Sequence, residues 1–123
     1  MGGDGFRQHL RRIRMKEITD SNFTVPSEGV VLIDFWAAWC APCRMLAPIL
    51  TKISGLMPEV QFYKIDVDDH RELAVKLAVK ELTALPTIVI YVNGKVYTTM
   101  SGFRSEGVLM DELRRATTSL TGV

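Results

Sequence analysis

Apolar residues recur along the 123-residue chain at two spacings, one typical of buried strands and one typical of amphipathic helices. Residues 30–36 are apolar except for Asp34, and their β-branched and aromatic side chains predict a strand that is buried on both faces. Over residues 41–57 the apolar positions fall at helical spacing, which predicts a helix almost directly after this strand.

The segments before and after residues 30–57 predict further strands and helices. Residues 14–18 predict a first edge strand, and the short connection after them is expected to be loop-like, since any helix there must end before Pro26. A strand is predicted over residues 60–67. Asp68-Asp69 is then expected to cap a helix over about residues 70–79.

A hairpin and a final helix complete the predicted order. Asn93-Gly94 separates two β-rich runs, 87–92 and 95–100, and favours a type I′ turn between antiparallel strands. Ser105 is expected to cap the last helix. The core-facing positions of that helix are predicted to be Val108, Leu109, Leu113 and Ala116. These elements together predict an α/β fold, a three-layer α/β/α sandwich around a mixed central sheet of about five strands.

The length, composition and net charge of the chain limit the classes of protein to which it can belong. The chain is long enough for one domain, and 47% hydrophobic and 24% charged residues are typical of a globular protein. A formal net charge of +1 gives no reason to expect nucleic acid as a partner, and no apolar run has the length of a membrane-spanning helix. With just two cysteines, the chain fits a reducing compartment, and we expect it in the cytoplasm.

Residues 1–14 differ from the domain predicted over residues 15–123. Glycines open this segment, and four arginines then surround three apolar residues. The apolar residues are Phe6, Leu10 and Ile13, and the arginines are Arg7, Arg11, Arg12 and Arg14. The expected structure is a solvated basic arm or a short helix leaning on the domain, whereas a targeting segment, a contact with an anionic surface and docking to one partner are alternatives.

Cys40 and Cys43 lie where the strand gives way to the helix. The first turn of a helix offers unpaired N–H groups and the positive end of the helix dipole, which favour a thiolate over a thiol. Cys40 is therefore predicted to be the nucleophile that attacks a disulfide, and Cys43, the more covered of the two, to resolve the mixed disulfide. Pro42 suits the first turn, where its missing N–H costs no hydrogen bond.

The sequence gives less support to three other roles for this CxxC pair. A structural disulfide that closes so short a loop removes little conformational entropy from the unfolded chain. A zinc site needs four ligands, and His9 and His70 are the remaining candidates, at spacings unlike those of zinc fingers. An iron–sulfur cluster needs more cysteines than one chain supplies. Residues 66–69 lack the glycine and terminal acid of a calcium loop, so no metal is expected there either.

Several segments, in this order, resemble the thioredoxin family. They are Ile18 to Phe23, Val31 to Pro48 with Trp-Cys-Ala-Pro-Cys inside it, Lys64 to Asp68, Leu85-Pro86-Thr87 and Asn93-Gly94-Lys95. The resemblance covers the chain from about residue 18 to its end and leaves out the basic arm. It implies the thioredoxin fold and a redox-active disulfide as the working group, with no other cofactor.

Asp34 is the one acid in the central strand, and burial raises the pKa of a carboxyl group. A carboxyl that exchanges protons near neutral pH could accept the proton of Cys43 when that thiol becomes a nucleophile. A buried acid held by local hydrogen bonds, with no catalytic part, is the alternative. The resemblance implies that Lys64 lies near this acid.

The resemblance also implies a groove for an extended protein substrate. In thioredoxins the proline matching Pro86 is cis and faces the cysteine pair, and the residue before it, here Leu85, offers backbone groups to the substrate. Small residues at Ala84 and Gly102 would leave room for that strand. An apolar rim is expected from Trp39, Ala41, Pro42, Val67 and Phe103.

Two features between the cysteines bear on the direction of the reaction. Ala41 stands where thioredoxins most often have glycine, and no histidine is present to stabilise a reduced thiolate. We therefore expect a reductant, at the low end of the span from about −270 to about −120 mV that separates thioredoxins from their oxidising relatives. The implied partners are disulfide-containing proteins and a thioredoxin reductase, and we expect a monomer. An isomerase or oxidase of the same fold, or a binding module without turnover, is the alternative.

Overall fold

The computed structural model describes residues 15–121, which form a five-stranded mixed sheet flanked by three helices. The strands are β1 (Met15–Glu17), β2 (Val30–Trp36), β3 (Val60–Asp66), β4 (Thr87–Val92) and β5 (Lys95–Ser101). The helices are α2 (Ala41–Leu56), α3 (Arg71–Ala78) and α4 (Glu106–Ser119). The strand order is β1-β3-β2-β4-β5; β1, β3 and β2 run parallel, and β4 and β5 are antiparallel to their neighbours. The predicted fold class is confirmed. The basic arm lies outside the described residues.

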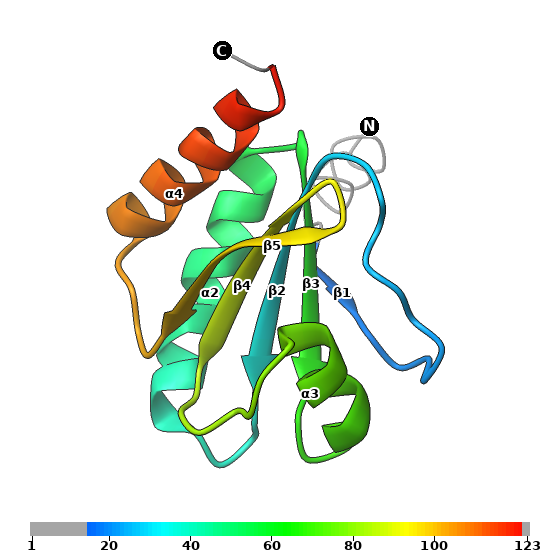
Figure 1. The fold of residues 1–123 in the computed structure, drawn as a ribbon. Coiled ribbons are helices and arrows are strands. Elements are labelled where there is room, and N and C mark those ends of the chain that lie inside the picture. The colour runs from blue at the N-terminus through cyan, green and yellow to red at the C-terminus, as the bar shows by residue number, and fades with distance from the viewer. Residues whose placement is uncertain (1–14, 122–123) are drawn as a thin grey trace, which may run out of the picture.

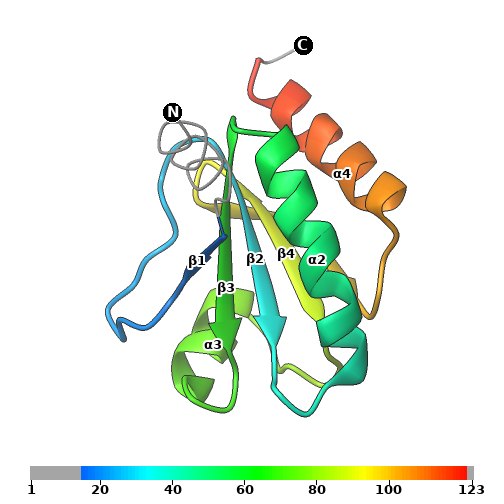
Figure 2. The same ribbon diagram turned by 180° about the vertical axis from the view of Figure 1, so that it is seen from behind.

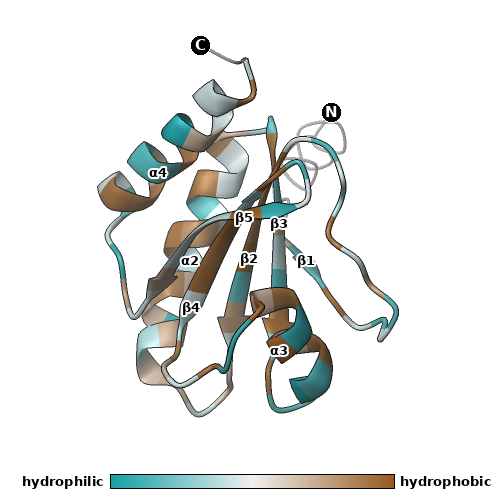
Figure 3. Ribbon diagram, in the orientation of Figure 1, coloured by the Kyte–Doolittle hydropathy of each residue, from teal (hydrophilic) through white to brown (hydrophobic). Residues whose placement is uncertain are grey.

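The helices form two layers, one on each face of the sheet. Helices α2 and α4 cover one face and α3 covers the other, as the two opposite views show (Figures 1 and 2). Brown hydrophobic colour follows β4 through the middle of the molecule, between these layers (Figure 3). The central strands are thus shielded from water on both sides, as an apolar run without alternation predicts.

Strand β2 sends alternate side chains into two separate cores, because successive residues of a strand point to opposite faces. Val31, Ile33 and Phe35 pack on the α3 side, in the same cluster as both cysteines. Val30 and Leu32 pack on the α2 and α4 side. By the same alternation Asp34 points toward α2, the helix that begins next to the cysteines.

Val108, which was predicted to face the core, and Met45, one of the apolar positions at helical spacing over residues 41–57, are both exposed. Met45 in α2 is 62% exposed, whereas Met57 at the end of the same helix is 5% exposed. Val108 in α4 is 45% exposed, although Leu109 beside it is buried. Each misplaced residue lies about 100° around its helix from a buried neighbour, so it falls outside the core-facing stripe.

The start of α3 differs from the prediction. His70 is the N-cap residue, and its side chain makes no capping hydrogen bond. Instead, the Asp66 carboxylate accepts hydrogen bonds from the backbone N–H groups of Asp68 and Asp69 at 2.9 and 3.4 Å. The predicted cap by Asp68-Asp69 is therefore wrong, because the preceding aspartate organises the turn and leaves the Asp68 side chain available for another contact.

Other local predictions are confirmed. Residues 18–29 contain no helix, as the proline in this short connection suggested. Asn93 and Gly94 both have positive φ, 51° and 82°, as a type I′ turn requires. The Ser105 hydroxyl accepts a hydrogen bond from the Val108 N–H at 3.3 Å and so caps α4.

A buried tyrosine ties α3 to the sheet. The Tyr91 side chain is 2% exposed, and its hydroxyl donates a 2.6 Å hydrogen bond to the carbonyl of Leu77 in the last turn of α3. Tyr91→Phe keeps the ring but leaves that carbonyl without its partner, so we expect a loss of about 1–2 kcal/mol in the free energy of unfolding. Urea denaturation measures it; an unchanged midpoint would show that water replaces the hydroxyl at no cost.

Candidate redox site

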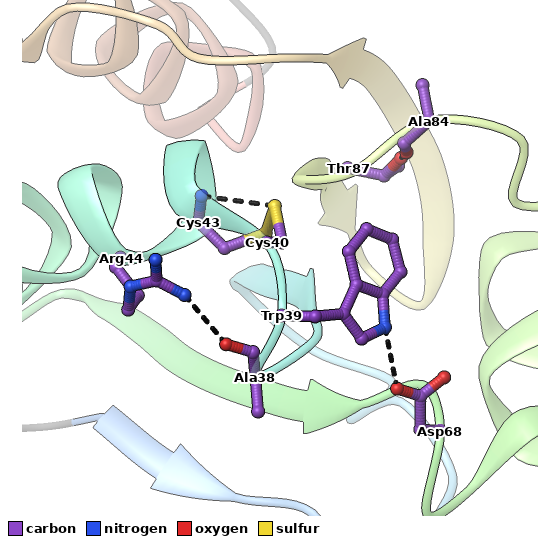
Figure 4. Close-up of a disulfide and its surroundings, with 8 residues drawn as sticks. All are labelled: Ala38, Trp39, Cys40, Cys43, Arg44, Asp68, Ala84 and Thr87. Atoms are coloured by element: carbon purple, nitrogen blue, oxygen red, sulfur yellow. Dashed lines mark hydrogen bonds between the residues drawn. A yellow bond between two sulfur atoms is a disulfide. The ribbon is translucent and has the colours of Figure 1, made fainter.

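The two cysteines form a disulfide at the start of α2. Cys40 is the N-cap residue, with extended backbone, and its Sγ accepts a hydrogen bond from the Cys43 N–H at 3.2 Å (Figure 4). Pro42 lies in the first turn, as predicted. A sulfur at this place receives the unpaired N–H groups and the positive dipole end of a sixteen-residue helix, which together favour its anionic form.

Burial does not distinguish the two cysteines strongly. Cys40 is 4% exposed and Cys43 is 3% exposed, so the difference predicted between them is very small. Their positions do differ, because Cys40 ends the loop that leaves β2 while Cys43 lies within the helix. Access to Cys40 therefore depends on its neighbours along the loop.

Trp39 is held beside the disulfide by Asp68, an acid that was expected to cap α3. The ring is 69% exposed, and its Nε1 donates a 2.8 Å hydrogen bond to Oδ2 of Asp68 (Figure 4). A polar residue just beyond the carboxyl end of β3 was the only sequence signal for this contact. The bond holds a large apolar surface in a defined orientation next to Cys40.

Arg44 is hydrogen-bonded to the loop between β2 and α2, which carries Cys40. Its Nη1 donates a 2.8 Å hydrogen bond to the carbonyl of Ala38, across the turn that carries Cys40 (Figure 4). The side chain is exposed, yet it also lines the cavity next to Cys43. No sequence signal indicated this second feature.

The segment before β4 lies at the same end of the sheet. The Leu85–Pro86 peptide bond is cis, as the resemblance implied. Leu85 packs against the core cluster that contains both cysteines, and the Pro86 carbonyl accepts a hydrogen bond from the Gly102 N–H at 2.7 Å. Ala84 is exposed, and its carbonyl accepts a 2.6 Å hydrogen bond from the Thr87 hydroxyl (Figure 4).

The residues expected to form an apolar rim separate into two groups. Trp39 and Phe103 are 69% and 41% exposed, and Ala41 and Pro42 are also exposed. Val67 is 3% exposed and belongs to the core cluster with the cysteines, so the expectation that it forms part of an exposed rim is wrong. It follows the last residue of β3, and its N–H bonds the Trp36 carbonyl at 2.9 Å, which draws it under the surface.

Behind Cys43 lies a cavity of about 130 Å³ that contains the acid of the central strand. It is lined by Asp34, Trp36, Cys43, Arg44, Ala47 and Lys64. Asp34 is 4% exposed, and burial raises its pKa from 3.8 to about 7, against the opposing effect of the Lys64 charge. Its Oδ1 is buried and has no hydrogen-bond partner among the described residues. A carboxyl with this pKa, next to a cysteine, exchanges protons at neutral pH.

Lys64 is the register partner of Asp34 on the adjacent strand β3. Its ammonium group lies 5.7 Å from the centre of the Trp36 ring, within range of a cation–π interaction. The lysine thus lies near the acid, as the resemblance implied, and its charge acts on Asp34 without an ion pair between them in the described part of the chain.

Within residues 15–121, no group of three or more histidine, cysteine, aspartate or glutamate side chains is arranged to hold a metal ion. No helix in that range is long and apolar enough to cross a membrane.

A disulfide at a helix N-terminus, with a buried acid of raised pKa behind it, defines a dithiol–disulfide oxidoreductase. Comparison with known proteins agrees. The thioredoxin family model matches residues 14–115, and the chain belongs to the thioredoxin family.

Named relatives cover most of the chain. Thioredoxin from Bacillus subtilis is 41% identical over 95 residues, 76% of this chain and 88% of that protein. Thioredoxin from Listeria monocytogenes is 40% identical over 103 residues, 82% of this chain and 97% of that protein. Among solved structures, a mutant thioredoxin from Halobacterium salinarum superposes with a TM-score of 0.74 at 28% identity, covering 86% of this chain and 93% of that one.

Proposed function

We propose that this protein-disulfide oxidoreductase works mainly as a reductant of protein disulfides. The observation that carries the proposal is the Cys40 sulfur at the N-cap of α2, hydrogen-bonded by the Cys43 N–H, with no histidine between the two cysteines. The helix end stabilises the thiolate enough to make it reactive. Without a histidine, the reduced form lacks the extra stabilisation that turns relatives of this fold into oxidants.

The proposed cycle starts from the dithiol. The Cys40 thiolate attacks one sulfur of a protein disulfide, so that a Cys40–substrate bond forms and the other substrate sulfur leaves as a thiolate, which takes up a proton. Cys43 then gives its proton to the Asp34 carboxylate and attacks Cys40. The Cys40–Cys43 disulfide forms, the second substrate sulfur is released, and two electrons have passed to the substrate.

The surroundings of the pair are proposed to serve this cycle. Lys64 supports the ionised form of Asp34 through its charge. The backbone around Leu85 and Pro86, with the small residues Ala84 and Gly102, accepts an extended substrate segment. Exposed apolar contacts come from Trp39, Ala41, Pro42 and Phe103.

We further propose that residues 15–123 work as one monomeric domain in the cytoplasm, with residues 1–14 as a separate arm. No cofactor besides the cysteine pair enters the cycle. A thioredoxin reductase would return the two electrons to the Cys40–Cys43 disulfide. Similarity to the named thioredoxins supports these assignments.

Trapping on Cys43→Ser tests the cycle. Without the resolving sulfur, the mixed disulfide with Cys40 persists, so we expect covalent complexes with a disulfide protein such as insulin. Excess dithiol should reduce the mixed disulfide and separate these complexes. They are measured by non-reducing electrophoresis and mass spectrometry. The control variant carries both Cys43→Ser and Cys40→Ser and should trap nothing. A binding module without turnover would give no complexes with either variant.

The direction of the reaction is tested by equilibration with glutathione or a reference dithiol. We expect the Cys40–Cys43 pair to have a potential near the lower end of the span from about −270 to about −120 mV. A value near the upper end would make the protein an oxidase or isomerase.

A further inference from the structure

An arginine lies beside the segment that is proposed to accept the substrate. Gly102 directly follows β5, and its N–H donates a 2.7 Å hydrogen bond to the Pro86 carbonyl. Arg104 is half-buried, and its Nη1 lies 3.6 Å from the point that a Cβ atom on Gly102 would occupy. The same nitrogen donates a 3.1 Å hydrogen bond to the Phe103 carbonyl. The guanidinium group is therefore folded back over Gly102, next to Pro86.

The charge of Arg104 is not neutralised by a neighbouring acid. Within residues 15–121 the side chain of Arg104 forms no ion pair. Glu106, the nearest acid along the chain, is paired with Lys52 of α2 at 3.0 Å instead. The hydrogen bond to Phe103 uses one of the five N–H donors of the guanidinium group, so the others remain available to a carboxylate.

The order of the strands places Arg104 and an acidic turn on opposite sides of the disulfide. The turn covers residues 66–69 at the end of β3 and contains three aspartates. One row of paired residues crosses this end of the sheet, through Ile65 of β3, Phe35 of β2, Thr87 of β4 and Ser101 of β5. The cysteines follow β2, so the acidic turn lies one strand away from them, and the loop with Arg104 lies two strands away on the other side (Figure 1).

We propose that Arg104 is a specificity-determining residue that favours protein disulfides with an acidic side chain close to the substrate cysteine. This inference rests on the proposed reduction of protein disulfides. Two strand spacings are about 10 Å, a distance that about three residues of extended chain span. The favoured position is therefore about two to four residues from the cysteine, on the side of the substrate that passes Gly102. An acid on the other side approaches residues 66–69 and is repelled.

The expected preference is modest, because an ion pair that water can reach is weak. We expect a substrate with Glu at the favoured position to react about three- to fivefold faster than the same substrate with Gln. Salt screens exposed charges, so the preference should decrease when NaCl is raised from about 0.05 to about 0.5 M.

Symmetric peptide disulfides test this preference. Each substrate is a dimer of a short peptide rich in Gly and Ala, with one cysteine and with Glu, Gln or Lys at one of about four positions before or after it. One reduced protein molecule converts one peptide disulfide into two peptide thiols while Cys40 and Cys43 become oxidised. Chromatography of the peptide thiol gives the second-order rate constant. We expect faster reduction of the Glu peptides on one side of the cysteine.

Substitutions of Arg104 show whether this side chain causes the preference. Arg104→Gln should abolish the preference, and Arg104→Glu should reverse it in favour of the Lys peptides. Arg104→Lys keeps the charge and should keep a preference for Glu. Arg114→Gln is the matched control and should behave like the wild type, because Arg114 lies beside Met57, the residue that ends α2 at the far end from the cysteines.

Several results would overturn the inference and leave the proposed function intact. These are equal rates for Glu and Gln at every position, an equal preference on both sides of the cysteine, and a preference that Arg44→Gln removes and Arg104→Gln does not. Loss of the preference in Arg104→Lys would assign it to the shape of the loop, and reduction of insulin without reduction of any peptide would show that a short segment is not recognised. If the wild type reduces neither insulin nor the peptides, the proposed function fails and the inference with it.

Discussion

Cys40→Ser reduces the rate of dithiol-dependent insulin reduction to the rate measured without protein. The reaction needs a sulfur anion that attacks another sulfur, and a serine hydroxyl stays protonated at neutral pH and forms no exchangeable bond. Cys43 cannot substitute for Cys40, because it lies within α2 and not at the end of the loop that leaves β2. The loss should therefore be complete.

The measurement is turbidity of reduced insulin with a dithiol as electron source. Circular dichroism and urea denaturation of Cys40→Ser, compared with the wild type in its reduced form, show whether the fold is intact. Serine and cysteine differ by one atom, and Cys40 ends a loop at the edge of the core, so we expect a folded variant. Residual turnover above the background rate would mean that Cys43 or another group can start the reaction, and the assigned order of the two cysteines would be wrong.

Asp34→Asn makes the protein more stable at pH 8 and leaves its stability at pH 4 almost unchanged. Burial raises the pKa of Asp34 to about 7 in the folded chain, against 3.8 for an unburied carboxyl. Between these two values the folded state holds a proton on Asp34 that the unfolded state has released, so the contribution of Asp34 to wild-type stability falls as pH rises from about 4 to about 7 and is level above that. A pKa difference of about 3 corresponds to a loss of about 4 kcal/mol in the free energy of unfolding of the wild type. The asparagine amide stays neutral at every pH, so the variant does not have this loss.

Urea denaturation of the oxidised protein across pH 4 to 8 measures this difference. Glu59→Gln, at an exposed acid, is the matched control and should follow the wild type. We also expect Asp34→Asn to slow insulin reduction at neutral pH, by up to about 10²-fold, because the Cys43 proton loses its acceptor. A variant with higher stability and an unchanged rate would show that Asp34 is buried without taking part in the proton transfer.

Local signals in the sequence were sufficient for most of the framework. The apolar run over residues 30–36 predicted a strand buried on both sides, and the structure has it at the centre of the sheet. Asn93-Gly94 predicted the turn between β4 and β5, because these residues tolerate the positive φ that the turn needs. The position of the cysteines at the start of a helix followed in the same way, from the change in spacing of the apolar residues.

Contacts between distant segments could not be predicted in this way. Trp39 and Asp68 are 29 residues apart, and the hydrogen bond between them depends on how the loops after β2 and β3 approach each other. The cavity that joins Arg44 to Asp34 and Lys64 depends on how α2 lies across the sheet. Burial of Val67 and exposure of Met45 likewise depend on which neighbour covers each side chain.

The sequence by itself determined the elements, the turn, the place of the cysteine pair and the presence of one acid in the central strand. These are local properties, set by side-chain spacing and backbone preference within a few residues. Only the tertiary structure decided that this acid lies in a cavity beside Cys43 and that Asp68 holds Trp39. Those features arise from the packing of helices and loops on the sheet, which brings together residues that no local pattern connects.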